Sequence, residues 1–214
     1  MSGVLVVTGT DTGIGKTVVA AGLAGALGAS YWKPIQAGTE DGTDSLSVTE
    51  LGSLSLSPNV LPEAYRLSLP ASPHLAAETE GVAIDTASLQ LPSPRPLVIE
   101  GAGGVLVPIR RDPPYFMADL FAQWAAPVLL IARSGLGTIN HSLLSIAALR
   151  ERSVSIAGIV MVGDAHPDNE RTVPALSGIP LLGRLPRLDP LDRASLAAAI
   201  AAYIDLAAIR AAMQ

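Results

Sequence analysis

The sequence predicts a single α/β domain over residues 1–214, built on a mostly parallel central sheet with helices on both faces. Its length of 214 residues is typical of one domain, and its 49% apolar content can furnish a substantial core. Short apolar runs alternate along the chain with helical patterns, and this alternation is typical of a parallel sheet covered by helices.

The predicted strands are short apolar runs without polar alternation, as expected for strands that are buried on both faces. A shorter strand ends at Trp32-Lys33, because Pro34 cannot donate a hydrogen bond to a central ladder. The other runs occupy residues 4–7, 96–99, 128–132, 156–162 and 180–183.

Helical spacing of apolar residues follows most of these runs, and the first helix is closed by Gly28. Segments 53–70 and 91–96 are rich in Ser, Pro and Leu, which indicates loops. The predicted helices cover residues 17–27, 73–80, 117–125, 139–152 and 195–213.

Charge and cysteine content limit the classes of partner and compartment. A net charge of −5 gives no basic surface for a phosphate backbone, so we expect no nucleic-acid partner. The absence of cysteine excludes disulfides and thiolate chemistry and favours a cytoplasmic protein. The start lacks a signal-peptide pattern, and Asp205 and Arg210 interrupt the Ala-rich end, so we expect no export and no membrane partner.

The segment from Gly9 to Thr17 predicts a phosphate-binding loop between a strand and a helix. Its glycines let backbone N–H groups approach phosphates, Lys16 can reach the β and γ oxygens, and Thr17 can hold Mg²⁺. The general pattern would place its first glycine at position 10, but this chain has Thr10 there and its glycine at position 9. The alternative to a phosphate-binding loop is a Gly-rich turn. The context favours a domain like that of the P-loop NTPases.

Two further features follow from the residues themselves. Glu100 ends a buried strand, at the edge where parallel sheets place ligand-binding groups. The glycines from Gly101 to Gly104 permit close approach of a ligand, although they could equally form a tight turn. Lys33 at a strand end is ordinarily a solvated flank, so its residue type alone does not assign it a function.

Six segments together resemble dethiobiotin synthetases, over about residues 4–190. They are Gly9 to Thr17, Trp32-Lys33-Pro34 with Gly38, Ala71-Ser72-Pro73-His74, Glu100-Gly101-Ala102-Gly103-Gly104, Gly135 to His141, and Pro180-Leu181-Leu182-Gly183 with Pro186. The resemblance implies an ATP-dependent cyclo-ligase that closes a urea ring on 7,8-diaminononanoate with CO₂ and Mg²⁺. A carbamate and then a carbamic-phosphate mixed anhydride precede dethiobiotin, and ADP and phosphate are released.

The resemblance also implies roles for individual residues. Lys16 and Lys33 would be catalytic, and Thr17, Asp44 and Glu100 would hold Mg²⁺. ATP would be bound by Gly13, Ile14, Gly15, Lys16, Thr17, Val18, Asp44, Glu100, Gly101, Ala102, Gly103, Pro186, Arg187 and Leu188. The diamine substrate would contact Thr12, Lys33, Ala37, Gly103, Gly104, Gly137, Thr138, Ile139 and Asn140. The last four open a helix that in this family binds the substrate carboxylate across a homodimer interface.

Some positions depart from the family pattern. Ala37 replaces a Ser or Thr that contacts a substrate amine, and Gln36 or Thr39 are candidate replacements. Gly13 stands where some relatives carry an acidic residue, and Val162-Gly163 stands where an Asn often holds adenine. We therefore expect weak selectivity for the nucleotide base.

The magnesium ligand on the loop after residue 38 is ambiguous. Glu40, Asp41 and Asp44 crowd this segment, and any of them could be a helix cap or a solvated charge. The family pattern selects Asp44, because Thr43-Asp44 matches a pair that opens a helix there.

Two other classes of protein share parts of this pattern. Partition and septum-positioning ATPases carry a second lysine five residues before the loop lysine, where this chain has Asp11. Related amide-forming ligases depend on a glutaminase with a Cys nucleophile, which this chain lacks. Both alternatives are disfavoured.

Overall fold

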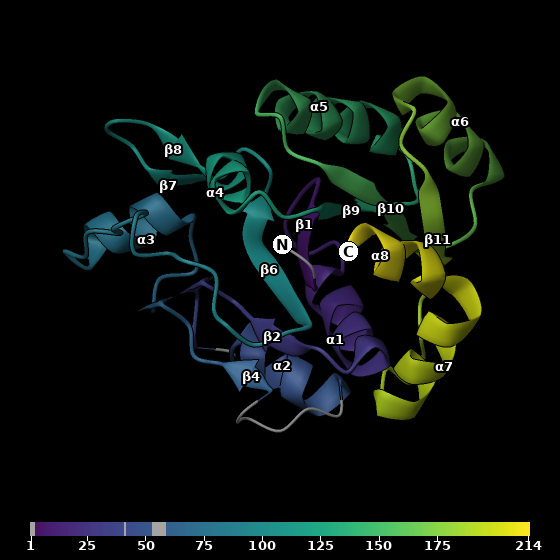
Figure 1. Ribbon diagram of the computed structural model, residues 1–214, viewed down its shortest axis with the longest axis horizontal. Helices are drawn as coiled ribbons and strands as arrows, with labels where there is room; N and C mark the ends of the chain where they lie inside the picture. Colours follow the sequence, from purple (N-terminus) through teal and green to yellow (C-terminus); the bar gives the residue numbers. More distant parts are fainter. Residues whose placement is uncertain (1–2, 41, 53–58) are drawn as a thin grey trace.

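The centre of the fold is a seven-stranded sheet in the order β11-β10-β9-β1-β6-β2-β4 (Figure 1). The computed structural model describes residues 3–40, 42–52 and 59–214. Every neighbouring pair in this sheet is parallel, which confirms the predicted fold class. The strands are β1 (Val4–Gly9), β2 (Ser30–Trp32), β4 (Val60–Leu61), β6 (Leu97–Gly104), β9 (Val128–Arg133), β10 (Ile156–Val162) and β11 (Leu181–Leu185).

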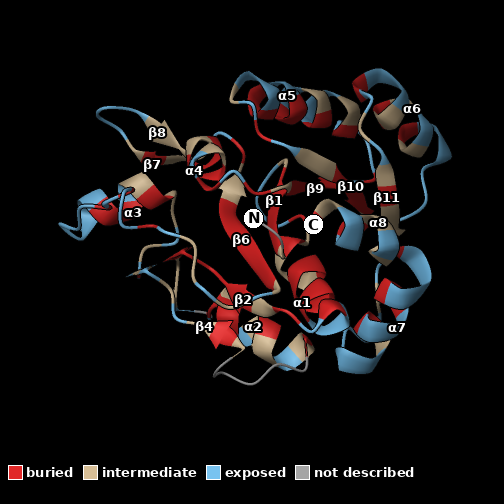
Figure 2. Cartoon of the chain, viewed as in Figure 1, coloured by how far each residue is buried: buried red, intermediate tan, exposed pale blue. Residues whose placement is uncertain are grey.

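Helices cover both faces because successive strand residues point to opposite sides. In β1, Val4 and Val6 belong to one apolar cluster, whereas Leu5 and Val7 belong to the other. The first cluster packs against α4 (Met117–Trp124), α5 (Thr138–Glu151) and α6 (Pro167–Ser177). The second packs against α1 (Lys16–Leu27), α2 (Asp44–Leu51), α7 (Arg193–Tyr203) and α8 (Leu206–Ala212). The central strands are accordingly buried, and the outer surfaces of α6 and α7 are exposed (Figure 2).

Two small sheets extend the fold beside β6. One pairs β3 (Ile35–Ala37) with β5 (Tyr65–Leu67) in parallel, and the other pairs β7 (Pro108–Arg110) with β8 (Tyr115–Phe116) antiparallel. Helix α3 (Pro73–Thr79) packs against β3, β5 and β7. These elements border the carboxyl ends of β6 and β2.

Several sequence predictions of secondary structure are wrong or incomplete. The segment 53–70 was expected to be a loop, but β4 and β5 lie within it, and its residues 53–58 are outside the described chain. Strands of two or three residues are too short to show periodicity. Helix α6 and the strands β3, β7 and β8 were not predicted. Strand β6 also continues through Glu100 to Gly104, so Glu100 lies within the strand rather than at its end, and residues 101–104 do not form a tight turn.

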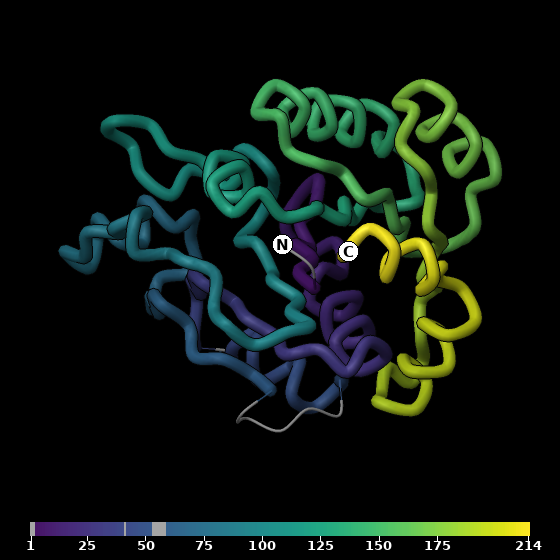
Figure 3. The backbone as a smooth tube through the Cα atoms, viewed as in Figure 1, coloured from purple at the N-terminus to yellow at the C-terminus, as the bar shows by residue number. Residues whose placement is uncertain are grey.

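The expected single terminal helix over residues 195–213 is also wrong. Ile204 adopts an extended conformation between α7 and α8 and bridges to Gly183 of β11, which stops the helix. The Asp205 carboxylate then caps α8 by accepting the N–H of Ala208 at 2.9 Å. The chain finally returns to its start, where Gly3 donates to the carbonyl of Met213 (Figure 3).

The two tryptophans pack in the core. Trp32 and Trp124 are 5% and 2% exposed, and their ring centroids are 5.8 Å apart. Each indole N–H donates to a backbone carbonyl, which satisfies the polar atom inside the core. Within the described ranges, none of the helices combines the length and apolar character needed to span a bilayer.

We expect the cap of α7 to make stability sensitive to acid. Asp192 accepts the N–H of Ser195 at 2.8 Å, and these hydrogen bonds from Ser195 lower the pKa of Asp192 below its ordinary 3.8. The cap therefore contributes fully above pH 3.8, and its contribution is lost as the pH falls through the lowered pKa of the folded state. Thermal unfolding of Asp192→Asn, which keeps the acceptor but cannot titrate, should show a weaker acid dependence than wild type. Asp164→Asn, at a carboxylate that is 85% exposed, is the control and should keep the wild-type slope.

Candidate active site

Strand register brings the predicted site residues to one edge of the sheet. Trp32 lies opposite Ile99 in the β2–β6 pair, so Lys33 and Glu100, each one residue further on, emerge side by side. Glu100 in turn lies opposite Val7 of β1, two residues before the phosphate loop begins at Gly9. Parallel strands end at the same edge, so three segments distant in sequence converge.

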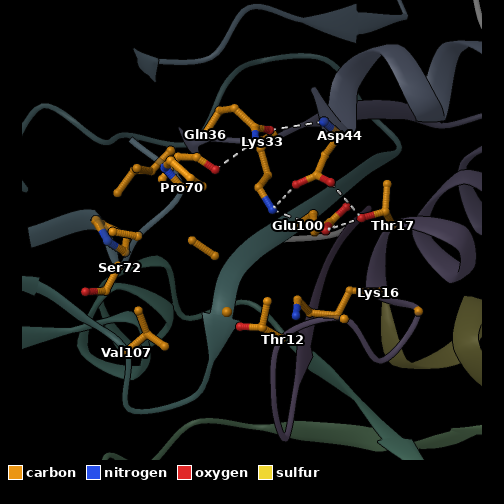
Figure 4. A pocket seen from close by; sticks show the side chains of 18 of the residues that line it. Thr12, Lys16, Thr17, Lys33, Gln36, Asp44, Pro70, Ser72, Glu100 and Val107 are labelled. Atoms are coloured by element: carbon orange, nitrogen blue, oxygen red, sulfur yellow. Dashed lines mark hydrogen bonds and ion pairs between the residues drawn. The ribbon is translucent and has the colours of Figure 1, made fainter. Parts of the chain in front are cut away.

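The centre of the site is an ion-pair network around Lys33 (Figure 4). Its ammonium lies 2.7 Å from Oδ2 of Asp44 and 3.2 Å from Oε1 of Glu100. The hydroxyl of Thr17 lies 2.9 Å from Oδ1 of Asp44 and 2.8 Å from Oε1 of Glu100. Lys33 is thus buried and paired, and the alternative of a solvated flank is excluded.

The charges of this network set the protonation of its members. Burial alone would lower the pKa of Lys33, but the carboxylates of Glu100 and Asp44 outweigh it and raise the pKa above its ordinary value. Burial likewise opposes the charge of Asp44, yet Lys33 lowers the pKa of Asp44. Lys33 is therefore a firmly held cation and Asp44 a firmly held anion at neutral pH.

The second lysine, Lys16, begins helix α1 inside the phosphate loop. It is 6% exposed, and its ammonium donates to the carbonyl of Asp11 at 2.8 Å. Burial lowers the pKa of Lys16, and although Glu100 raises it, the charge of Lys33 acts with burial. Lys16 and Lys33 are the two lysines of the 214-residue sequence, and both are in this site.

The displaced first glycine has a steric explanation. A Cβ at Gly9 would lie 2.6 Å from the side chain of Ile14 and 3.1 Å from that of Lys16, because the loop folds back over this position. Gly15 caps α1 with a φ of 96°, which strongly favours glycine. A larger residue at position 9 would therefore have to displace the outer parts of the Ile14 and Lys16 side chains, and glycine avoids that displacement.

A cleft of about 790 Å³ opens between the phosphate loop, α2, α3 and β6. It brings together most of the predicted nucleotide, metal and substrate residues, namely Thr12, Gly13, Gly15, Lys16, Thr17, Val18, Lys33, Ala37, Asp44, Glu100, Ala102 and Gly103. Asp44 is the loop carboxylate that lines it, whereas Glu40 is exposed and Asp41 lies outside the described residues.

Three predicted residues lie next to this cleft without lining it. Ile14 is buried against Gly9, and Gly101 packs so closely on Phe121 that a Cβ there would lie 2.8 Å from the ring. Gly104 lines a neighbouring hollow of about 270 Å³ instead. Ile14 and Gly101 therefore shape the site from beneath.

The predicted carboxylate-binding residues at the start of α5 are separate from the cleft. Gly137 caps the helix with a φ of 91°, Thr138 is buried, and Asn140 is exposed. None of the residues 137–140 lines either the cleft or the neighbouring hollow within the described chain. A substrate carboxylate bound by residues 137–140 would therefore lie outside this cleft.

The predicted late nucleotide segment follows β11 and also lies outside the cleft. Arg187 is exposed and 3.8 Å from Asp164, while Pro186 and Leu188 are half-buried. Nearby, the N–H of Gly163 donates to Leu185, and its carbonyl accepts from Arg184 at 2.9 Å. The backbone of Gly163 is thus already engaged and does not replace the missing Asn.

Two supporting contacts of the site were not predicted, one from Tyr31 and one from Gln36, which the sequence offered only as a substrate contact. The hydroxyl of Tyr31 donates to Oε2 of Glu100 at 2.8 Å. Tyr31 lies in β2, two positions before Lys33, which directly follows the strand, so alternation could have indicated the shared face. The side chain of Gln36 accepts the N–H of Asp44 at 3.1 Å and donates to the carbonyl of Gly38, so it holds the start of α2.

A third missed residue supports the start of α5. Asn169 of α6 is 5% exposed, and its amide donates to the carbonyls of Ser134 at 2.8 Å and Gly135 at 3.3 Å. It fixes the loop between β9 and α5. Because α6 was not predicted, the sequence offered no reason to connect Asn169 with this loop.

The donor set suits a magnesium ion. Thr17, Asp44 and Glu100 supply one hydroxyl and two carboxylates, which are hard oxygen ligands. No group of three or more His, Cys, Asp or Glu that could hold a metal occurs among the described residues. An ion here would complete its shell with phosphate and water oxygens, which is the usual pattern for Mg²⁺ at a nucleotide.

The parallel sheet, the glycine loop at a helix start and the buried lysines define a nucleotide-binding protein of the P-loop class. A family model described as "AAA domain" matches residues 3–195, and the chain belongs to that family. Curated relatives narrow the family further. The "ATP-dependent dethiobiotin synthetase BioD" of Rhodopseudomonas palustris (strain TIE-1) is 58% identical over 206 residues, which are 96% of each chain.

Two more relatives carry the same name. The protein of Novosphingobium aromaticivorans is 58% identical over 92% of this chain and 94% of its own length. That of Brucella anthropi is 54% identical over 96% of both chains. The chain belongs to the ATP-dependent dethiobiotin synthetase family.

Solved structures with a similar fold include a ParA family ATPase and a septum site-determining protein. A ParA family ATPase from Chlorobium tepidum TLS has a TM-score of 0.54 at 11% identity, covering 100% of this chain and 97% of that chain. The septum site-determining protein MinD of Pyrococcus horikoshii OT3, solved with Mg-ADP, has a TM-score of 0.54 at 18% identity, covering 93% and 86%. These similarities show the fold alone.

Proposed function

We propose that this chain, acting as one domain, makes dethiobiotin from 7,8-diaminononanoate and CO₂ and converts ATP to ADP and phosphate. The observation that carries the proposal is the placement of Lys33, held between Asp44 and Glu100 beside the phosphate loop. Relatives named ATP-dependent dethiobiotin synthetase at 54–58% identity support the same reaction.

The reaction needs charge neutralisation more than a protein nucleophile. One amine of the substrate adds to CO₂ and loses a proton to give a carbamate. A carbamate oxygen attacks the γ-phosphorus of ATP, and ADP leaves. The second amine then attacks the carbonyl carbon of this mixed anhydride and displaces phosphate, which closes the ring. Lys16 and Lys33 supply two cations for the carbamate and the transferred phosphoryl group.

Magnesium is proposed as the metal of this site, held by Thr17, Asp44 and Glu100. It would neutralise charge on the phosphate oxygens of ATP. The oxygen-only donor set and the position of Thr17 at the start of α1 support this assignment.

We further propose a homodimer in which the start of α5 from one protomer binds the carboxylate of a substrate held by its partner. The separation of residues 137–140 from the cleft supports this arrangement. The hollow beside the cleft is bordered by Leu106 and Leu144, which are 52% and 62% exposed, as expected for a surface covered by a second copy. Sedimentation equilibrium tests the mass, and a monomer that is fully active would contradict this part of the proposal.

Weak base selectivity is proposed because Val162-Gly163 offers no side-chain amide and the Gly163 backbone is engaged. We expect turnover rates with CTP and GTP to lie within about tenfold of the rate with ATP. A tenfold difference corresponds to roughly 1.4 kcal/mol of lost contacts to the base. Initial rates with the three nucleotides measure this. Turnover with ATP alone would contradict it.

The cytoplasm is the proposed compartment, because the reaction consumes ATP and because a chain without cysteine gains nothing from an oxidising environment.

The decisive experiment is an assay of the purified chain with diaminononanoate, bicarbonate, Mg²⁺ and ATP. We expect a product with the mass of dethiobiotin, formed in equal amount to ADP. Omission of the diamine should abolish ADP formation above a slow background. No product, together with ATP hydrolysis that a protein partner stimulates, would instead support a switch ATPase.

A further inference from the structure

A buried phenol is hydrogen-bonded to the carboxylate of Glu100, which lies within β6. Tyr31 is 0% exposed and Glu100 is 1% exposed, and the Tyr31 hydroxyl donates to Oε2 of Glu100 at 2.8 Å. Hydrogen bonds to an ionised acceptor are stronger than those between neutral groups. This bond therefore fixes the orientation of Glu100 from the side of the core.

The two oxygens of Glu100 consequently have different environments. Oε2 is occupied by Tyr31, whereas Oε1 lies 2.8 Å from the Thr17 hydroxyl and 3.2 Å from the Lys33 ammonium. Thr17 lies at the cleft, so the oxygen that can meet a ligand there is Oε1. The phenol lies on the core side of the same carboxylate.

The number of carboxylate oxygens offered to a metal bears on its identity. Mg²⁺ requires a near-octahedral shell and takes one oxygen from a carboxylate, whereas Ca²⁺ takes six to eight ligands and accepts both oxygens of one carboxylate. We propose that Tyr31 is a positioning residue that holds Oε2 of Glu100 on the core side, leaves Oε1 as the one oxygen offered to the cleft, and thereby makes the site select Mg²⁺ over Ca²⁺. This inference rests on the metal site given under the proposed function. It does not depend on which molecule receives the CO₂.

The hydroxyl of Tyr31 can act as the donor, because a tyrosine phenol carries its proton at neutral pH. The ring itself packs in the apolar cluster beneath α1, which leaves it little freedom to turn away from Glu100.

Tyr31→Phe removes the one oxygen and keeps the ring. The test measures the affinity of the chain for adenylyl imidodiphosphate, an ATP analogue that is not hydrolysed, by calorimetry with excess Mg²⁺ and separately with excess Ca²⁺. We expect the preference for the Mg²⁺ complex to fall about tenfold relative to wild type, as expected from losing one hydrogen bond to a charged group. If the Mg²⁺-over-Ca²⁺ preferences of wild type and Tyr31→Phe agree within about twofold, well below that loss, then Tyr31 only fills space.

Tyr115→Phe is the matched control, because the Tyr115 hydroxyl also bonds a side chain, Gln123 at 2.8 Å, but lies away from the cleft. It should keep the wild-type preference. In a Glu100→Gln background, Tyr31→Phe should change the preference no further, since the carboxylate through which it acts is gone.

A crystal structure of the wild-type chain with Mg²⁺ and the analogue gives a second readout that does not depend on the variant's folding. One-oxygen coordination by Glu100, with Oε2 still bonded to Tyr31, supports the inference, and two-oxygen coordination or no metal at Glu100 overturns it. These binding measurements need no turnover. A chain that shows the expected metal preference but makes no dethiobiotin would disprove the proposed reaction and leave this inference standing.

Discussion

Replacing Lys33 with alanine should reduce dethiobiotin formation by about 10²–10³-fold or more, the loss typical for removing one group that stabilises a transition-state charge. The Lys33 ammonium lies 2.7 Å from Asp44 and 3.2 Å from Glu100, so its removal takes the positive charge away from that point. Steady-state kcat with saturating ATP and diamine measures the effect. Near-normal activity would refute the role assigned to Lys33.

The stability of Lys33→Ala distinguishes chemistry from folding. Without the ammonium, two carboxylates face each other in a buried site, which is unfavourable. We expect a lower melting temperature in the absence of metal and a recovery when Mg²⁺ and ADP are added. Arg171→Ala, which removes a cation that is 79% exposed, is the control. It should change neither the melting temperature without metal nor the rise on adding Mg²⁺ and ADP.

The second large effect is expected for Lys16→Ala. Lys16 begins α1 within the phosphate loop and lines the cleft, and we propose that its ammonium contacts the transferred phosphoryl group. We expect kcat/KM for ATP to fall about 10²–10³-fold. Initial rates over a range of ATP concentrations measure this.

The KM for the diamine separates the two lysines. Lys33 is proposed to contact the carbamate as well as the phosphoryl group, so Lys33→Ala should also weaken diamine binding. Lys16→Ala should leave the KM for the diamine close to wild type. An equal rise in that KM for both variants would contradict the division of roles.

The residues at the ends of the long strands were predictable from sequence. Glu100 and the loop after Gly9 follow continuous apolar runs, and parallel strands place their carboxyl ends together. The glycine loop also predicted the start of the helix that carries Thr17. These features depend on local patterns, which is why several residues that line the cleft could be named before the fold was known.

What the sequence could not predict depends on strand order and on short elements. The bond from Tyr31 to Glu100 joins residues 69 positions apart, and it exists because β2 pairs with β6. Strand β4 has two residues, and β2 supplies its partner in the sheet. The break at Ile204 likewise requires its bridge to Gly183, a tertiary contact that helix propensity does not report.

Both lysines lie in one cleft, so a spectroscopic signal from lysine side chains reports on the active site alone. Lysine occurs at positions 16 and 33 alone, and the remaining basic side chains are arginines and histidines. Growth on lysine labelled with ¹³C at Cε would place NMR-visible nuclei on these two side chains without changing their chemistry. Their resonances could then follow nucleotide, metal and diamine as each enters the cleft, without any engineered label.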